Sequence, residues 1–179
     1  RQSYKLGAPI TDLEIVGECN DTGTTISFMP DEAIFDEIEF KFDTLEHRLR
    51  ELSFLNKGIK IVFEDKRENH EKKKEFHYTG GLVEYVKFLN KSRTGIHDDI
   101  VYIDKKVDDY VVELAMQYTD GYSENIYSFA NNINTHEGGT HLAGFKTALT
   151  KTINEYAKRN KLLKESEPNL LGEDIREGL

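Results

Sequence analysis

Residues 140–158 read THLAGFKTALTKTINEYAK, and this stretch decides the fold class. Its apolar side chains recur at helical spacing within an arc of about 80°, at Leu142, Phe145, Leu149, Ile153 and Tyr156. We therefore expect a long amphipathic helix with Thr140 as its N-terminal cap. Lys151 and Lys158 fall nearly opposite the arc and Lys146 flanks it, which predicts a basic ridge that faces solvent.

Short alternating segments surround this helix. Alternation predicts strands at Leu13–Val16, Thr24–Phe28, Ile59–Phe63, Phe76–Thr79, Ile100–Ile103, Tyr110–Tyr118 and Asn125–Asn131. Ile59–Phe63 is expected to pair with Phe76–Thr79 across a charged connection, Glu64–Glu75. An Asp-Gly turn at Thr119–Tyr122 predicts a hairpin between the last two strands.

Two shorter helices are also expected. The first has Asp43 as its cap, a stripe at Leu45, Leu49, Leu52 and Leu55, and a stop at Asn56–Gly58. The second follows Gly80-Gly81 and has Leu82, Val86 and Leu89 on one face. Helices and strands in this mixture predict an α+β protein.

Composition excludes several classes of protein. The 179 residues include one cysteine, which excludes an intramolecular disulfide framework. No apolar run approaches the ~18 residues of a membrane span, so we expect no membrane partner. The net charge is −9, which speaks against wholesale coating of nucleic acid. However, residues 142–164 carry six basic residues and one acidic residue, so contact with a polyanion is electrostatically sensible there.

Other candidate sites are incomplete. His136 and His141 are five residues apart with two glycines between them, so they do not match the i, i+4 spacing of a helical zinc motif, and no metal site is expected. Gly138-Gly139 before a helix fits either an anion site on free amides or a loop that needs glycine dihedrals. The acidic pairs Asp98-Asp99 and Asp108-Asp109 are interpreted as solvated turn residues. The sequence has no phosphate-binding Walker loop and no nucleophile elbow.

Several motifs together resemble the B subunits of bacterial DNA gyrase. They are Asp21–Thr25, Arg48–Asn56, Gln117–Gly121, Ile126–His141, Ala143–Thr150 and Gly172–Gly178. The resemblance covers essentially the whole chain in order. The related topoisomerase IV protein is the near neighbour, and Asn134–Glu137 and Phe54–Asn56 favour gyrase over it.

The resemblance implies two domains, each an α/β sandwich. Residues 1–96 resemble the C-terminal part of a GHKL-type ATP-binding domain. Residues 97–179 resemble the N-terminal part of a transducer domain with a ribosomal-protein-like left-handed βαβ topology. The polar stretch Lys91–Asp99 interrupts periodicity near that boundary. We therefore expect the chain to be a piece of a longer protein.

The resemblance also implies functional residues. Thr24 matches the threonine that reaches the adenine, and Ile26 is expected to line the base pocket. Lys146, Lys151 and Lys158 are candidates for DNA contact. The catalytic glutamate, the magnesium-binding asparagine, the glycine-rich lid and the Gln-Thr-Lys loop of the family have no match here. No catalytic residue is therefore expected in this chain, which should not turn over ATP.

Function and partners follow from the same resemblance. The intact enzyme is expected to be an ATP-hydrolysing topoisomerase that negatively supercoils DNA in the bacterial cytoplasm. This chain would form one wall of the adenine pocket and couple the nucleotide state to movement of the DNA gate. The cofactors are ATP and Mg²⁺, and neither is expected to bind tightly to this chain. The partners are DNA, the gyrase A subunit and a second B subunit. The alternatives are a piece of a topoisomerase IV B subunit and a non-catalytic folded module that binds neither ATP nor DNA.

Overall fold

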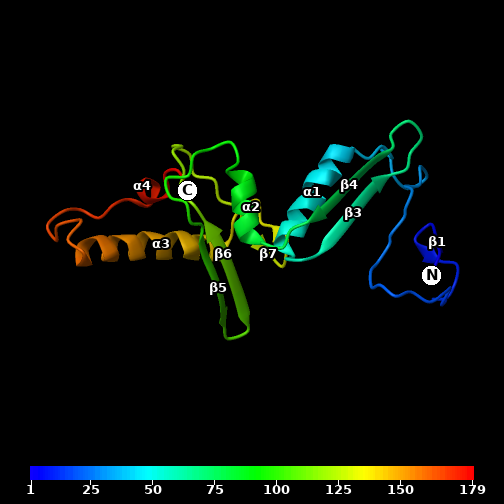
Figure 1. Cartoon of the computed structure of the whole chain (residues 1–179), viewed down its shortest axis with the longest axis horizontal. Coiled ribbons are helices and arrows are strands. Elements are labelled where there is room, and N and C mark those ends of the chain that lie inside the picture. The colour runs from blue at the N-terminus through cyan, green and yellow to red at the C-terminus, as the bar shows by residue number, and fades with distance from the viewer. The chain divides into compact units, whose positions relative to one another are not determined.

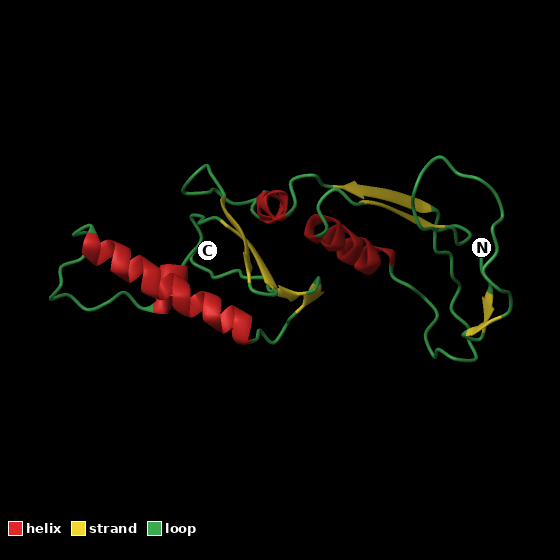
Figure 2. Ribbon diagram, turned by 90° about the horizontal axis from the view of Figure 1, so that it is seen from below, coloured by secondary structure: helices red, strands yellow, loops and turns green.

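The computed structural model describes all residues from Arg1 to Leu179 (Figures 1 and 2). They divide into two compact units, Arg1–Lys41 and Phe42–Leu179. The helices and strands, in chain order, are β1 Tyr4–Lys5, β2 Ala8–Pro9, α1 Phe42–Leu55, β3 Lys60–Asp65, β4 Lys72–His77, α2 Leu82–Leu89, β5 Val101–Val107, β6 Tyr110–Met116, β7 Phe129–Ala130, β8 Ile133–Asn134, α3 Thr140–Arg159 and α4 Gly172–Arg176. Helices combined with small antiparallel sheets confirm the α+β class. No helix is both long and apolar enough to cross a lipid bilayer.

The first unit contains one small hairpin. β1 and β2 pair across Leu6-Gly7, and both turn residues have positive φ, as a two-residue hairpin turn requires. The strands predicted at Leu13–Val16 and Thr24–Phe28 are wrong, because neither segment forms a strand. A strand needs a neighbour for its backbone hydrogen bonds, and within this unit only β1 and β2 pair.

In the second unit, α1 lies along the β3–β4 hairpin (Figure 1). An aromatic core forms around Phe54. Phe54 is 1% exposed and stacks on Tyr78, with ring centroids 3.7 Å apart. Tyr85 of α2 stacks on the same ring at 4.9 Å. The first predicted helix is thus confirmed, although it begins at Phe42 and places Asp43 within its first turn instead of at the cap. The second predicted helix is confirmed as α2.

The β3–β4 hairpin confirms the predicted pairing but is longer than expected. Ile61 lies opposite Phe76, as the alternation predicts. The strands also take in half of the charged segment predicted as a connection, which shortens the loop to residues 66–71. Opposite charges face one another across the hairpin, since Lys60 pairs with Glu75 at 2.8 Å. Such cross-strand pairs stabilise a sheet, so a run of charged residues does not by itself indicate a loop.

The hairpin predicted between Tyr110–Tyr118 and Asn125–Asn131 is wrong. β6 pairs with β5 instead, through the two-residue turn at Asp108-Asp109, where Asp108 has a φ of 53°. The segment after β6 binds other parts of the chain: Asp120 N–H donates to the Thr94 carbonyl and Thr119 N–H to the Gly178 carbonyl. These bonds occupy the backbone groups that the predicted hairpin would need.

α3 confirms the long helix predicted from the 140–158 stretch. Thr140 is its first residue, and Gly139 holds the cap position without a side-chain hydrogen bond, so the cap predicted at Thr140 is wrong. Gly139 has a φ of 150°, which disfavours any residue with a Cβ there, and this explains why the cap position holds no side chain.

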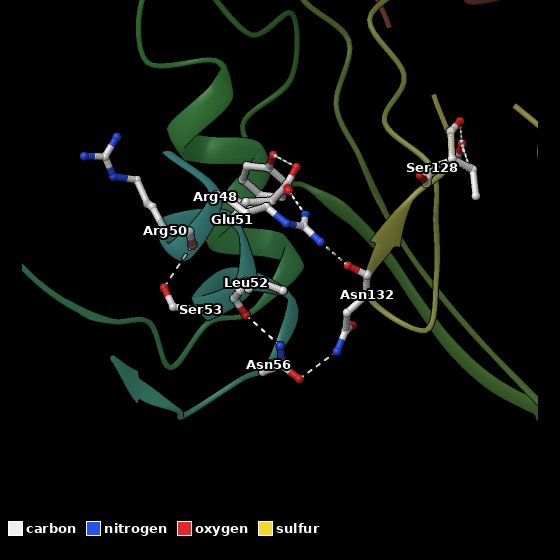
Figure 3. Close-up of polar contacts among 10 residues, drawn as sticks. Arg48, Arg50, Glu51, Leu52, Ser53, Asn56, Ser128 and Asn132 are labelled. Atoms are coloured by element: carbon white, nitrogen blue, oxygen red, sulfur yellow. Dashed lines mark hydrogen bonds and ion pairs between the residues drawn. The ribbon is translucent and has the colours of Figure 1, made fainter. Parts of the chain in front are cut away.

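A polar joint connects α1 to the turn between β7 and β8 (Figure 3). Arg48 pairs with the buried carboxylate of Glu51 and donates from its second terminal nitrogen to the Asn132 carbonyl at 2.8 Å. The Asn132 amide donates to Asn56 Oδ1, also at 2.8 Å. Tyr85 O–H donates to Glu51 at 3.3 Å. Residues more than 75 positions apart in the chain are thereby held together.

Replacing Arg48 tests the joint. Arg48→Ala leaves the Glu51 carboxylate buried without its cation, and we expect the free energy of unfolding to fall by about 3 kcal/mol. The measurement is urea unfolding of the 179-residue chain, followed by circular dichroism. Arg93→Ala is the matched control, because Arg93 is exposed, and it should stay within about 0.5 kcal/mol of the unchanged chain. Equal losses in the two variants would contradict a stabilising joint.

Candidate functional site

An open groove of about 660 Å³ lies between α3 and the segment 169–176. Its charged lining is mostly basic, with Lys146, Lys151 and Lys158 from α3, Arg176 from α4, and one acidic residue, Glu155. The three lysines predicted as DNA contacts thus line a single groove. They do not form a fully exposed ridge, because Lys146 and Lys158 are half-buried and only Lys151 is well exposed.

Asn154 holds the two walls of the groove together. It is 6% exposed, and its amide forms a reciprocal pair with Leu170: Nδ2 donates to the Leu170 carbonyl at 3.0 Å, and Oδ1 accepts from the Leu170 N–H at 2.8 Å. The Asn154 amide therefore gives the backbone of Leu170 the two hydrogen bonds that a neighbouring strand would otherwise supply. The sequence did not predict this contact between Asn154 and Leu170, because an asparagine on an amphipathic helix is normally expected at the surface.

The C-terminal end of α3 turns the chain back toward the groove. Lys161 has a φ of 58°, and the Leu162 N–H donates to the Ala157 carbonyl at 2.8 Å. This is the pattern of a Schellman cap, which satisfies a carbonyl that the helix leaves free. Lys158 and Arg159 occupy the last turn, where the helix dipole favours positive charge.

The cations of the groove are not equivalent. Glu124 pairs with both Lys146 and Arg176. Lys151 and Glu155 approach only to 3.8 Å, and both side chains are more than 60% exposed, so this pair contributes little. Lys158 has no carboxylate partner. The groove therefore offers two cations, Lys151 and Lys158, that are largely free to meet an anion.

Burial pushes the pKa of Glu124 up, but the hydrogen bonds from Lys146 and Arg176 outweigh that effect, so its pKa lies below the ordinary value. The carboxylate is therefore ionised at neutral pH, and the two bases that contact it share its single negative charge.

Thr24 and Ile26 lie in the first unit, on exposed chain without regular secondary structure. Ile26 is 80% exposed. The structure therefore gives neither residue an enclosed pocket, and the nucleotide contacts expected for them stay predictions.

The histidine stretch forms a turn. Gly138 and Gly139 both have positive φ, as the loop interpretation requires. The His141 ring folds back toward Thr135, with Nε2 and Oγ1 at 3.3 Å. No group of three or more His, Cys, Asp or Glu side chains is placed to hold a metal ion anywhere in the chain.

Comparison with known proteins identifies relatives. A family model described as DNA gyrase B matches residues 81–179. The B subunit of DNA gyrase from Bacillus mycoides is 55% identical, covering 99% of this chain and 44% of that protein. Its counterpart from Streptococcus pneumoniae serotype 4 is also 55% identical, covering 99% of this chain and 28% of that protein. The chain thus spans less than half the length of these relatives.

Solved structures also resemble this chain. The 43K ATPase domain of Thermus thermophilus gyrase B, in complex with an aminocoumarin, has a TM-score of 0.81 at 35% identity, covering 99% of this chain and 48% of that one. The topoisomerase IV ATP-binding domain of Francisella tularensis shares the fold more distantly, with a TM-score of 0.63 at 22% identity, covering 89% of this chain and 43% of that one. Topoisomerase IV is therefore the remoter neighbour, and the chain belongs to the DNA gyrase B family.

Proposed function

We propose that this chain connects the nucleotide site to the DNA-handling surface of a gyrase-type topoisomerase. Similarity to gyrase B proteins over 99% of the chain is the observation that carries the proposal. The whole enzyme hydrolyses ATP with Mg²⁺ and negatively supercoils DNA in the bacterial cytoplasm. It works with the gyrase A subunit and with a second B subunit.

Residues 1–96 form the C-terminal part of the GHKL domain in this proposal, and residues 97–179 the first part of the transducer. Thr24 supplies a hydroxyl to the adenine and Ile26 packs against the base. Both side chains are available for such contacts because they are exposed on chain without regular secondary structure. The chain contributes one wall of the nucleotide pocket, and the catalytic groups come from elsewhere in the enzyme.

The polar joint is the proposed route by which the two parts influence each other. Arg48 belongs to the first part and the Asn132 carbonyl to the second, and the bond between them is 2.8 Å long. A movement of α1 is therefore passed to the β7–β8 turn, whose last residue, Asn132, lies eight positions before the start of α3 at Thr140. Rigid elements that shift together are a common basis for switching in ATP-driven proteins.

DNA contact is assigned to the groove beside α3. Lys151 and Lys158 present unneutralised charge there, and Lys146 lies in the same lining. Phosphate contacts of this kind carry no sequence information, which suits an enzyme that passes DNA without regard to sequence.

Mg²⁺ receives no ligands from this chain in the proposal. No cluster of His, Cys, Asp or Glu side chains fits an ion, so the residues described do not match that role.

Calorimetric titration of the chain with a non-hydrolysable ATP analogue tests the nucleotide side. We expect a Kd weaker than about 1 mM, because Thr24 and Ile26 offer one open wall and no enclosure. Binding in the micromolar range would contradict the assignment of only one wall of the pocket to these residues.

A double charge reversal tests the DNA side. For duplex DNA of about 25 base pairs, we expect Lys151→Glu with Lys158→Glu to remove two phosphate contacts and reduce the slope of log K against log salt by about 1.8. Lys105→Glu with Lys106→Glu is the matched control, since it makes the same change of charge on the exposed strand β5. Equal effects in the two double variants would show a general charge effect and would contradict a contact in the groove.

A further inference from the structure

Glu124 connects three separate segments through one carboxylate. It lies on the loop between β6 and β7, and its two oxygens receive different cations. Lys146 of α3 pairs with Oε1, and Arg176 of α4 donates from Nε to Oε2 at 2.7 Å. The three side chains are only 16–32% exposed, so solvent screens these contacts less than it screens surface ion pairs.

Both cations also line the groove proposed to contact DNA. Glu124 therefore pairs with two of the four bases in that lining, Lys146 and Arg176, and cancels one unit of their positive charge. Its contact with Arg176 uses Nε, so the two terminal nitrogens of the guanidinium are not taken by Glu124. These nitrogens form the planar fork that suits a phosphate.

Gly172 keeps space open beside that fork. A Cβ at this position would lie 2.7 Å from Arg176 Nη1 and 3.2 Å from Thr150 Oγ1. Thr150 lines the same groove. A larger residue at 172 would therefore push against the guanidinium, whereas glycine leaves it room to change partner.

From this geometry we propose that Glu124 is a resident counter-ion of the groove, which a phosphate of bound duplex DNA displaces from Lys146 and Arg176. The inference rests on the proposed function, since it needs DNA in the groove. The groove then presents two free cations before DNA arrives and four once it is occupied. Displacement opposes binding, so Glu124 keeps the contact weak and reversible, as transient passage of a DNA segment requires.

The segments held by Glu124 have other attachments. The Tyr118 hydroxyl donates to the Ile175 carbonyl at 2.8 Å, and the Asn125 N–H donates to the Leu179 carbonyl at 2.7 Å. The loop and the C-terminal residues therefore stay together when the carboxylate changes partner, and a neutral residue at 124 is compatible with folding.

Glu124→Gln tests the proposal, because glutamine keeps the shape and removes the charge. With linear duplex DNA as the probe, we expect binding at low salt to tighten at least about tenfold. The slope of log K against log salt should steepen by about 0.9, because the variant removes one negative charge from the groove. Glu165→Gln is the matched control, since it removes the same charge from an exposed residue outside the groove lining. It should leave the slope unchanged.

Combining Glu124→Gln with Lys146→Met refines the test. Removal of one cation restores the net charge of the groove and should return the slope to that of the unchanged chain. An unchanged slope in Glu124→Gln, in a chain that binds DNA, overturns the counter-ion role and leaves the proposed function standing. Absence of DNA binding in the unchanged chain and in every variant overturns the proposed function as well. Circular dichroism of each variant confirms that the comparison is made between folded chains.

Discussion

The buried carboxylate of Glu51 is the constraint on which the second unit depends. Glu51 is 7% exposed, and a charge at that depth is tolerated only with a partner and with hydrogen bonds. Arg48 supplies the partner from the same helix, and Tyr85 supplies a hydroxyl from α2. Burial and the neighbouring Glu51 charge both raise the pKa of Tyr85, so this hydroxyl keeps its proton and remains a donor.

Arg48 also reaches the turn between β7 and β8, which ties the aromatic core around Phe54 to the part of the chain that carries α3. That turn accepts the contact because Asn131 and Asn132 both adopt positive φ, at 49° and 65°. Asparagine tolerates this conformation better than most residues, so the turn can be this tight. The same peptide geometry exposes the carbonyl that Arg48 binds. Helix, hairpin turn and core are therefore parts of one arrangement.

Periodicity predicted the helices α1, α2 and α3 and the strands β3, β5 and β6. It failed where pairing decides the structure. Leu13–Val16 alternates as a strand does, yet no neighbour pairs with it. The alternation of Tyr110–Tyr118 predicts a strand but does not identify its partner. The Asp-Gly turn after it favours Asn125–Asn131, whereas β6 pairs with β5. An Asn-Asn pair between Ala130 and Ile133 was the available signal for the β7–β8 turn.

The candidate site was predicted in part. Spacing placed Lys146, Lys151 and Lys158 on one helix, but their sharing of a groove depends on Asn154, which binds residue 170 across 16 positions. Glu124 was invisible to the sequence, because its partner Arg176 lies 52 residues away. Charge counts locate a basic segment, whereas three-dimensional pairing determines which of its charges are free. The difference matters here, since two of the four basic side chains in the groove already share one carboxylate.

We infer that Phe42–Leu179 responds as one body, so that a change at α1 also affects α3. Native-state amide hydrogen exchange in low urea tests it directly, because it reports the opening free energy of each element separately. The account predicts that the most protected amides of α1, β3 and α3 converge on one free energy and one dependence on urea. Two separate values, one for α1 with β3 and another for α3, would contradict it.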